Sequence, residues 1–178
     1  PLRLVGSEMC IRDRNILKDF GADVKCGDMI SVRGNGLRGI KIDISQCPDL
    51  FPALAATACA ALGDTIFTNA ARLRIKESDR IEAVEKMINS LGGSAESTED
   101  SLTVRGTGTL PGGEVDSFND HRIVMALAVA AIASGLPALL CGAEAVDKSW
   151  PAFWSVLRGL GAKVELNTDK QEEFDIKA

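Results

Sequence analysis

Apolar residues gather in two stretches of the chain that contain no charged side chain. The first predicts a helix over Pro52–Leu62, which ends at Gly63 and is followed by a strand over Thr65–Thr68. The second stretch, Ile123–Cys141, approaches the length of a membrane span, for which ~20 apolar residues are needed. These two stretches define the regions of the chain that are predicted to be most deeply buried.

The second stretch is predicted to be a helix and a strand, not a membrane span. Gly135-Leu136-Pro137 interrupts it, and proline cannot continue a helix. It therefore divides into a helix over Ile123–Ser134 and a short strand over Ala138–Cys141. Its alanine content makes it only moderately apolar. The same order of apolar helix and short strand occurs in the first stretch.

A repeat relates the two stretches. Three segments, each a helix end closed by glycine, share one pattern: Phe20–Val24, Leu91–Ala95 and Leu160–Val164. After the first two come a strand ending in Val-Arg-Gly, a glycine-bounded strand, the apolar helix and its short strand. A period of about 70 residues is too long for a solenoid and suits a repeated unit of two helices and several strands. We therefore predict an α/β fold with internal pseudo-symmetry.

An amphipathic helix closes each unit. Its apolar face is predicted to hold Ile81, Val84, Met87, Ile88 and Leu91 in the first copy, and Trp150, Phe153, Trp154, Leu157 and Leu160 in the second. Asp79 with Glu82 three residues later predicts a capping box. Ser149 before Trp150-Pro151 predicts an N-cap with proline in the first turn.

The ends of the chain do not follow the repeat. Val5–Arg14 precedes the first helix and resembles translated sequencing-adapter sequence. We expect residues 1–14 to be a leader that does not belong to the repeated fold, and the adapter-like sequence indicates an artefact as its origin. Residues 168–178 are expected to be a polar tail.

Composition narrows the classes of partner. The 178 residues are 46% hydrophobic and 25% charged, which fits one ordinary soluble domain or two small ones. The net charge of -5 argues against a general affinity for nucleic acid or anionic membrane, and 4% aromatic residues leave little for base stacking. Five cysteines without a C-x-x-C pair and a single histidine do not indicate a zinc site; they favour free thiols in a reducing, cytoplasmic compartment.

Charged residues concentrate at three predicted helix starts. Arg72–Arg80 carries four cations, Asn119–Arg122 precedes the most apolar helix, and Asp49 precedes the other apolar helix. Each also has a simple structural explanation. The basic segment could be a solvated loop, His121 a hydrogen-bonded structural histidine, and Asp49 a helix cap.

The repeat favours a shared site over three separate explanations. Asp49 and Asp120 lie one period apart, and Lys148 takes in the second unit the place that Lys76 has in the first. The helix starts are therefore predicted to converge at one end of the domain and to bring together Asp49, Lys76, Glu77, Arg80, Arg122 and Lys148. Cations suit phosphate and carboxylate, and carboxylates suit proton transfer, which indicates a site for a small polyanionic substrate.

Three motifs resemble the 5-enolpyruvylshikimate-3-phosphate (EPSP) synthase family, in that family's order. They are Arg74–Arg80 (RIKESDR), Asn119–Ala126 (NDHRIVMA) and Pro48-Asp49 with the following alanine-rich helix. The resemblance extends from about residue 15 to 167. It implies repeated βαβαββ units of the enolpyruvyl transferase fold, within one pseudo-threefold domain. Residues 15–167 would be an incomplete C-terminal domain, with the N-terminal domain of the same chain missing.

The resemblance also implies an activity. The family transfers the enolpyruvyl group of phosphoenolpyruvate to the 5-hydroxyl of shikimate 3-phosphate and releases phosphate, on the route to chorismate and the aromatic amino acids. It needs no metal or organic cofactor. A monomer is expected for the full-length protein, and negligible turnover for this chain alone.

Roles carry over from the family motif by motif. Asp49 would contact the shikimate ring and accept the proton of the attacking hydroxyl, and Lys76 would bind the phosphate of shikimate 3-phosphate. Glu77 would exchange a proton at the methylene carbon of phosphoenolpyruvate. The cations around phosphoenolpyruvate would be Arg80, Arg122 and Lys148, with Lys148 also catalytic and with Asp120 and His121 in support.

Two alternatives remain open. UDP-N-acetylglucosamine enolpyruvyl transferase shares the fold but lacks the first two motifs. A non-catalytic anion-binding domain could use the same cations, although it would gain nothing from Asp49 and Glu77. Asp49 turned away from Arg80 and Arg122 would favour this second alternative.

Overall fold

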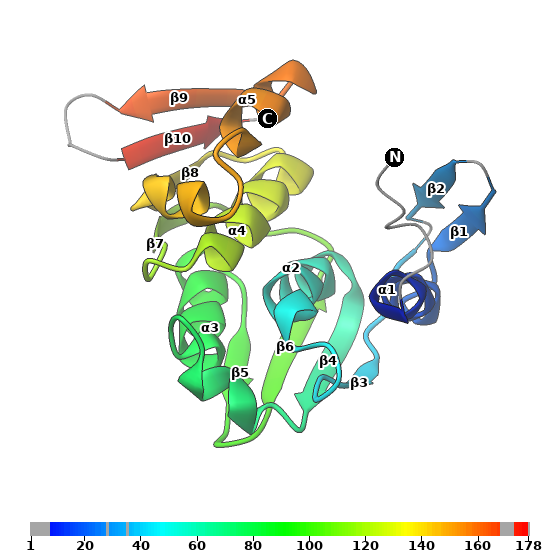
Figure 1. The fold of residues 1–178 in the computed structure, drawn as a ribbon. Helices are drawn as coiled ribbons and strands as arrows, with labels where there is room; N and C mark the ends of the chain where they lie inside the picture. Colours follow the sequence, from blue (N-terminus) through cyan, green and yellow to red (C-terminus); the bar gives the residue numbers. More distant parts are fainter. Residues whose placement is uncertain (1–7, 28, 35, 168–172, 178) are drawn as a thin grey trace.

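The computed structural model describes residues 8–27, 29–34, 36–167 and 173–177. Its longer helices alternate along the chain with the strands that form its sheets (Figure 1). The helices are α1 (Glu8–Asp19), α2 (Phe51–Ala60), α3 (Arg80–Ser90), α4 (His121–Ser134) and α5 (Phe153–Gly159), with short 3-10 helices η1 (Pro48–Leu50), η2 (Ala71–Ile75) and η3 (Ala143–Lys148). The strands are β1 (Asp23–Cys26), β2 (Ile30–Arg33), β3 (Lys41–Asp43), β4 (Leu62–Thr68), β5 (Ala95–Ser97), β6 (Leu102–Thr107), β7 (Gly113–Asp116), β8 (Ala138–Cys141), β9 (Lys163–Asn167) and β10 (Glu173–Lys177).

Sheet topology confirms the predicted repeat. One sheet has the strand order β3-β4-β6-β5 and the other has β7-β8-β10-β9. In each sheet the first pair is parallel and the other two pairs are antiparallel. Along the chain, β3-α2-β4-α3-β5-β6 and β7-α4-β8-α5-β9-β10 are two βαβαββ units, as expected of the enolpyruvyl transferase fold.

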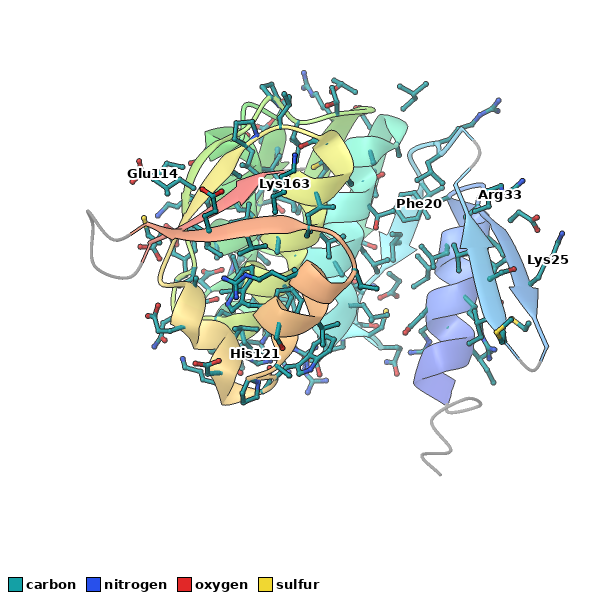
Figure 2. The ribbon with its side chains drawn as sticks, turned by 90° about the horizontal axis from the view of Figure 1, so that it is seen from above. Phe20, Lys25, Arg33, Glu114, His121 and Lys163 are labelled. Carbon is teal, nitrogen blue, oxygen red and sulfur yellow. The ribbon has the colours of Figure 1, made fainter. Side chains whose placement is uncertain are left out.

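Elements α1, β1 and β2 repeat the second half of such a unit. The antiparallel pair β1-β2 follows α1 as β5-β6 follows α3. The pair stands apart from the two sheets, while Phe20 is fully buried and lies between it and the rest of the chain (Figure 2). Helix α1 begins at Glu8, within the segment 1–14 expected to be a leader; residues 1–7 lie outside the described residues.

The two alanine-rich helices form the centre of the core. Helix α2 packs against α4, and each also packs against the sheet of its own unit (Figure 1). Helix α4 ends, as predicted, at Gly135, which adopts a left-handed conformation (φ 70°). Helix α2 ends two residues before the predicted Leu62, which instead begins β4. Within the described residues, no helix combines the length and apolarity that crossing a membrane requires.

Helix α3 has the predicted apolar face and the predicted N-cap. Its five expected inward-facing residues are all buried. The Asp79 carboxylate accepts a hydrogen bond from the backbone N–H of Glu82 (3.1 Å). The Glu82 carboxylate does not complete the reciprocal half of a capping box, because it pairs with Lys86 one turn further on (2.5 Å).

Helix α5 begins later than predicted. Its N-cap is Ala152 and not Ser149, because the backbone N–H groups of Ser149 and Trp150 both donate to the Val146 carbonyl and thereby extend the preceding turn. Only part of the expected apolar face is covered: Phe153 and Trp154 are buried and Leu157 is half-buried, whereas Trp150 and Leu160 are exposed.

The expected polar tail over 168–178 includes a strand. Residues 173–177 form β10, which pairs with both β8 and β9 in the second sheet. The alternation of Phe174 and Ile176 with charged residues is a strand pattern that the overall polarity of this segment conceals. The remainder of the expected tail, 168–172 and 178, lies outside the described residues.

Candidate active site

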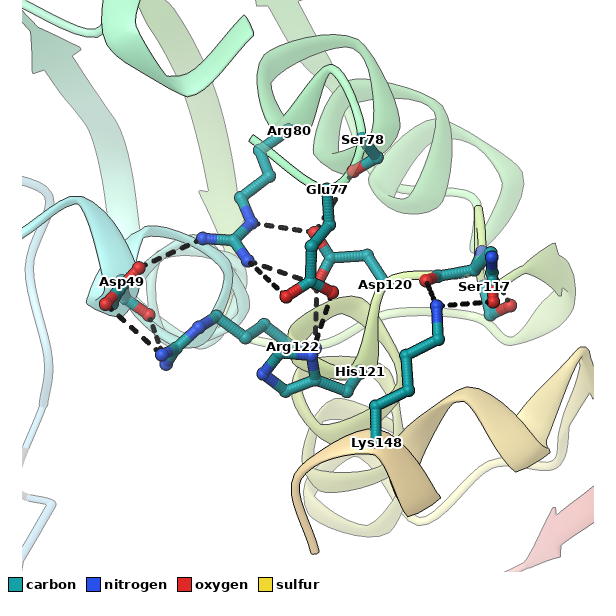
Figure 3. A network of polar contacts seen from close by, with 10 residues as sticks. Asp49, Glu77, Ser78, Arg80, Ser117, Asp120, His121, Arg122 and Lys148 are labelled. Carbon is teal, nitrogen blue, oxygen red and sulfur yellow. Dashed lines mark hydrogen bonds and ion pairs between the residues drawn. The ribbon is translucent and has the colours of Figure 1, made fainter. Parts of the chain in front are cut away.

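A buried ion pair joins the starts of α3 and α4. Arg80, the first residue of α3, is 2% exposed, and Asp120, the N-cap of α4, is fully buried. The guanidinium donates from Nε to Oδ2 of Asp120 (2.7 Å) and from Nη2 to Oδ1 (3.3 Å) (Figure 3). Because α3 and α4 belong to different units, this pair fixes one unit against the other.

Two further donors complete the surroundings of Asp120. The Ser78 hydroxyl donates to Oδ2 (3.1 Å), and the backbone N–H of Arg122 donates to Oδ1 (2.9 Å) and so caps α4. Burial works against the charged carboxylate, but the hydrogen bonds from Arg80 and Arg122 outweigh it and hold the pKa of Asp120 below its usual value. Asp120 is therefore a charged, fully partnered residue inside the protein.

Asp49 lies between two arginines. Its Oδ1 is 3.1 Å from Nη1 of Arg80, and its Oδ2 is 3.2 Å from Nη2 of Arg122. Its backbone carbonyl also accepts from Nη1 of Arg122 (3.2 Å). The carboxylate caps neither η1 nor α2, so its interpretation as a helix cap is wrong. The side chain is 38% exposed, so it can meet a ligand while it faces both arginines.

Glu77 and His121 form a second pair beside this network. Oε2 of Glu77 lies 2.9 Å from Nδ1 of His121, and Oε1 lies 4.0 Å from Nη2 of Arg80. His121 is buried, which confirms that it is a hydrogen-bonded histidine, whereas the Glu77 side chain is 42% exposed. The Glu77 carboxylate is thus accessible, and the buried His121 imidazole fixes its orientation.

The lysines differ in how they relate to the network. Lys148 donates from Nζ to both the backbone oxygen and Oδ1 of Asn119 (2.6 Å each), and so lies against the start of α4. Lys76 is exposed at the end of η2 and makes no hydrogen bond or ion pair with any described residue. The structure therefore brings together all the predicted site residues except Lys76. It adds Ser78 and Asn119, which lie inside the recognised motifs but carry no charge to draw attention to them.

Both arginines already form ion pairs with carboxylates of the chain. Arg80 and Arg122 face the three carboxylates of Asp49, Glu77 and Asp120. An anionic ligand must therefore share these arginines with carboxylates that are already in place. What the site offers is two accessible carboxylates at fixed positions beside two oriented guanidinium groups, an arrangement suited to proton transfer on an anionic substrate.

One group of side chains has ligand atoms close enough for a metal ion. Glu77, Asp120 and His121 each offer one such atom within 4.8 Å of the others. The oxygens of Asp120, however, already accept from a hydroxyl, a backbone N–H and the Arg80 guanidinium at 2.7 Å. A cation placed there would meet the arginine charge, so these residues fit an ion-pair network better than a metal centre.

A groove opens beside the network. It lies between α2 and α4, has a volume of about 520 Å³, and carries Asp49 and Arg122 at its edge. Its other walls are mainly apolar and include Ala53, Met125, Val129 and Trp150. The charged residues thus adjoin an uncovered apolar surface.

Comparison with known proteins identifies relatives over most of the chain. The sequence model of the family described as EPSP synthase (3-phosphoshikimate 1-carboxyvinyltransferase) matches residues 9–157, so the match begins within the expected leader. Relatives named 3-phosphoshikimate 1-carboxyvinyltransferase include those of Clostridium kluyveri (45% identity over 85% of this chain and 36% of the relative) and Methanocella arvoryzae (44% over 84% and 36%). A solved EPSP synthase from Acinetobacter baumannii superimposes with a TM-score of 0.74 at 34% identity, over 82% of this chain and 37% of that one. The chain thus spans about a third of the length of these relatives.

Proposed function

The chain belongs to the EPSP synthase family, and from this premise we propose that it is the C-terminal part of an enzyme that transfers the enolpyruvyl group of phosphoenolpyruvate to the 5-hydroxyl of shikimate 3-phosphate, with release of phosphate. The observation that carries the proposal is the position of Asp49. An accessible carboxylate held by Arg80 and Arg122 is what proton transfer beside an anion requires. A passive anion-binding domain would gain nothing from it, because the carboxylate competes with the ligand for the arginines.

The proposed roles are those that the family resemblance implies, and the positions of the residues support them. Asp49 accepts the proton of the attacking hydroxyl, while Arg80 and Arg122 fix its two oxygens and attract the anionic groups of phosphoenolpyruvate. Glu77, oriented by His121, exchanges the proton at the methylene carbon. Such a frame of fixed charges lowers the barrier because the groups need no rearrangement as charge moves during addition and elimination.

The lysines complete the proposed site. Lys148 lies beside the start of α4, where it supplies positive charge to phosphoenolpyruvate and a proton donor to the reaction. Lys76 binds the phosphate of shikimate 3-phosphate; its exposed side chain has the reach for a ligand that approaches from outside the network. We propose that neither a metal nor an organic cofactor takes part.

The relatives extend beyond the part that this chain matches, and we propose that this additional part is the partner of the chain. The groove between α2 and α4 is apolar, and Val129 and Leu160 are 53% and 79% exposed. Exposed apolar surface bordered by polar residues is typical of protein interfaces. We propose that the N-terminal part of the same protein covers it and supplies the other half of the site, in a cytoplasmic monomer, and that this chain alone has negligible turnover.

The test is an extended protein, in which the N-terminal part of the Clostridium kluyveri relative precedes this chain. Phosphate release is measured with both substrates. Asp49→Ala and Lys148→Ala should each lower kcat by about 10²-fold or more, the usual contribution of a proton-transfer group. Lys25→Ala, which removes an exposed lysine paired with Asp23 in β1, is the control and should leave kcat unchanged. Full activity of Asp49→Ala would refute the assignment, and activity only with a UDP-sugar acceptor would favour the sister enzyme.

A further inference from the structure

The turn before α4 contains two consecutive residues in a conformation that side chains disfavour. Phe118 and Asn119 have φ values of 52° and 54°, in the left-handed region. Residues other than glycine rarely adopt this region, and asparagine is among those that tolerate it best. Residues held in this way recur at functional sites, where the surrounding contacts maintain the strain.

Local contacts hold this turn in place. The backbone N–H of Phe118 donates to Oδ1 of Asp116 (2.5 Å), and that of Asn119 donates to Oγ of Ser117 (3.1 Å). Gly142 packs directly behind Ser117, since a Cβ atom at this glycine would lie 2.4 Å from the serine Oγ. The turn is thus fixed from two sides, independently of any ligand.

The turn places two oxygens of one residue on one ammonium group. The backbone carbonyl and Oδ1 of Asn119 each lie 2.6 Å from Nζ of Lys148. A lysine ammonium has three N–H donors, so two are engaged and the third can reach a ligand. Lys148 is otherwise exposed at the end of η3, and among the residues that the structure describes only Asn119 binds its ammonium group.

We propose that Asn119 is a positioning residue for Lys148. Its left-handed backbone and its amide oxygen hold the ammonium at one place beside the α4 start, with one N–H left for the substrate. The inference rests on the function proposed above for Lys148, but the contact itself can be tested without that function.

The first experiment measures the rate at which an N-hydroxysuccinimide ester acetylates Lys148 in the 178-residue chain, by peptide mass spectrometry. Asn119→Gly relieves the backbone strain and removes Oδ1, so acetylation should become about two- to tenfold faster, as expected for one lost hydrogen bond. Asn119→Asp keeps an oxygen and should retain the protection. Lys41 on β3 is the internal reference. An unchanged rate in Asn119→Gly would overturn the proposal.

A matched control comes from the same residue type in the same conformation. Asn69 has φ 57° and binds Asp43 through its side chain (2.8 Å), with no contact to Lys148. Asn69→Gly should therefore leave the acetylation rate of Lys148 unchanged. If it raised the rate as much as Asn119→Gly did, the effect would be a general loosening, and the proposal would fail.

The second experiment is a double-mutant cycle in the extended protein. Asn119→Gly should lower kcat about tenfold, with little change in KM for shikimate 3-phosphate, and should have no further effect when Lys148 is already alanine. Multiplied effects in the double variant would show that Asn119 acts independently of Lys148. An inactive wild-type extended protein would count against the proposed function alone, because the acetylation rates would still decide whether Asn119 holds Lys148.

Discussion

Replacement of Asp120 by alanine should destabilise the chain strongly. It leaves the Arg80 guanidinium, which is 2% exposed, without the carboxylate that lies 2.7 Å away. Removal of one partner of a buried ion pair costs about 3–5 kcal/mol. Asp49, 3.1 Å from the same guanidinium, offsets part of this loss. We therefore expect a value near the lower end, about 3 kcal/mol, including the lost N-cap of α4.

The measurement is guanidinium chloride unfolding of the 178-residue chain, with the free energy of unfolding obtained by linear extrapolation. Asp120→Asn keeps an acceptor for the cap and for Arg80, so it should cost less than alanine does. Glu82→Ala, which breaks the exposed pair with Lys86, is the control and should cost at most about 0.5 kcal/mol. A loss of less than about 1 kcal/mol for Asp120→Ala would refute the reasoning, since that is no more than an average point substitution costs.

The pH dependence gives an independent check of the same pair. The folded-state pKa of Asp120 lies below that of an unfolded aspartate, about 3.9. The stability that Asp120 contributes is therefore fully present above about pH 4 and is lost as the pH falls further, through the folded-state pKa. The difference in stability between the unsubstituted chain and Asp120→Asn should accordingly shrink under acid conditions. A difference that stayed constant down to pH 2 would contradict the assigned ion pair.

Two further predictions concern packing and thiol chemistry. Gly106→Ala should destabilise the chain by about 1–3 kcal/mol in the same unfolding assay, because the new Cβ would lie 2.2 Å from the Ala58 carbonyl oxygen; Gly159→Ala, with open space around it, should be neutral or slightly stabilising. Burial raises the pKa of the Cys59 thiol to about 12, so iodoacetamide at pH 8 should label the exposed Cys26 and spare Cys59 until the chain unfolds; equal labelling rates in the folded chain would contradict this.

Much of the fold follows from short-range patterns. The apolar helices and the glycines that end them are local features, and helix α4 with Gly135 is found where the sequence predicts it. The start of α5 is harder to predict, because Ser149 has the residue type of an N-cap while its backbone N–H completes an earlier turn by donating to Val146. Strand β10 is hidden by the overall polarity of its segment, although Phe174 and Ile176 alternate with charged residues as in a strand. The start of α5 thus depends on a partner in another element, whereas β10 has a local signal that composition obscures.

The site, like the fold, is predicted from the sequence only in part. The repeat predicts that Asp49, Arg80 and Arg122 meet, because equivalent positions of two packed units come together, and they do. The repeat does not reveal that the arginines are already paired with carboxylates, since that depends on side-chain reach across the interface between units. Lys76 shows the limit of the repeat argument: its sequence position matches that of Lys148, but the end of η2 leaves it outside the network.

Asp49 and Asp120 show how a duplicated position can acquire two different uses. Both stand at the start of an alanine-rich helix, one period apart, and both bind Arg80. They differ in depth, since one is 38% exposed and the other fully buried, and only the buried one caps its helix. The buried carboxylate is the permanent counter-ion of Arg80, so the arginine does not depend on Asp49 alone for its charge balance. The exposed carboxylate can therefore exchange its arginine contact for another partner without leaving a buried charge unpaired.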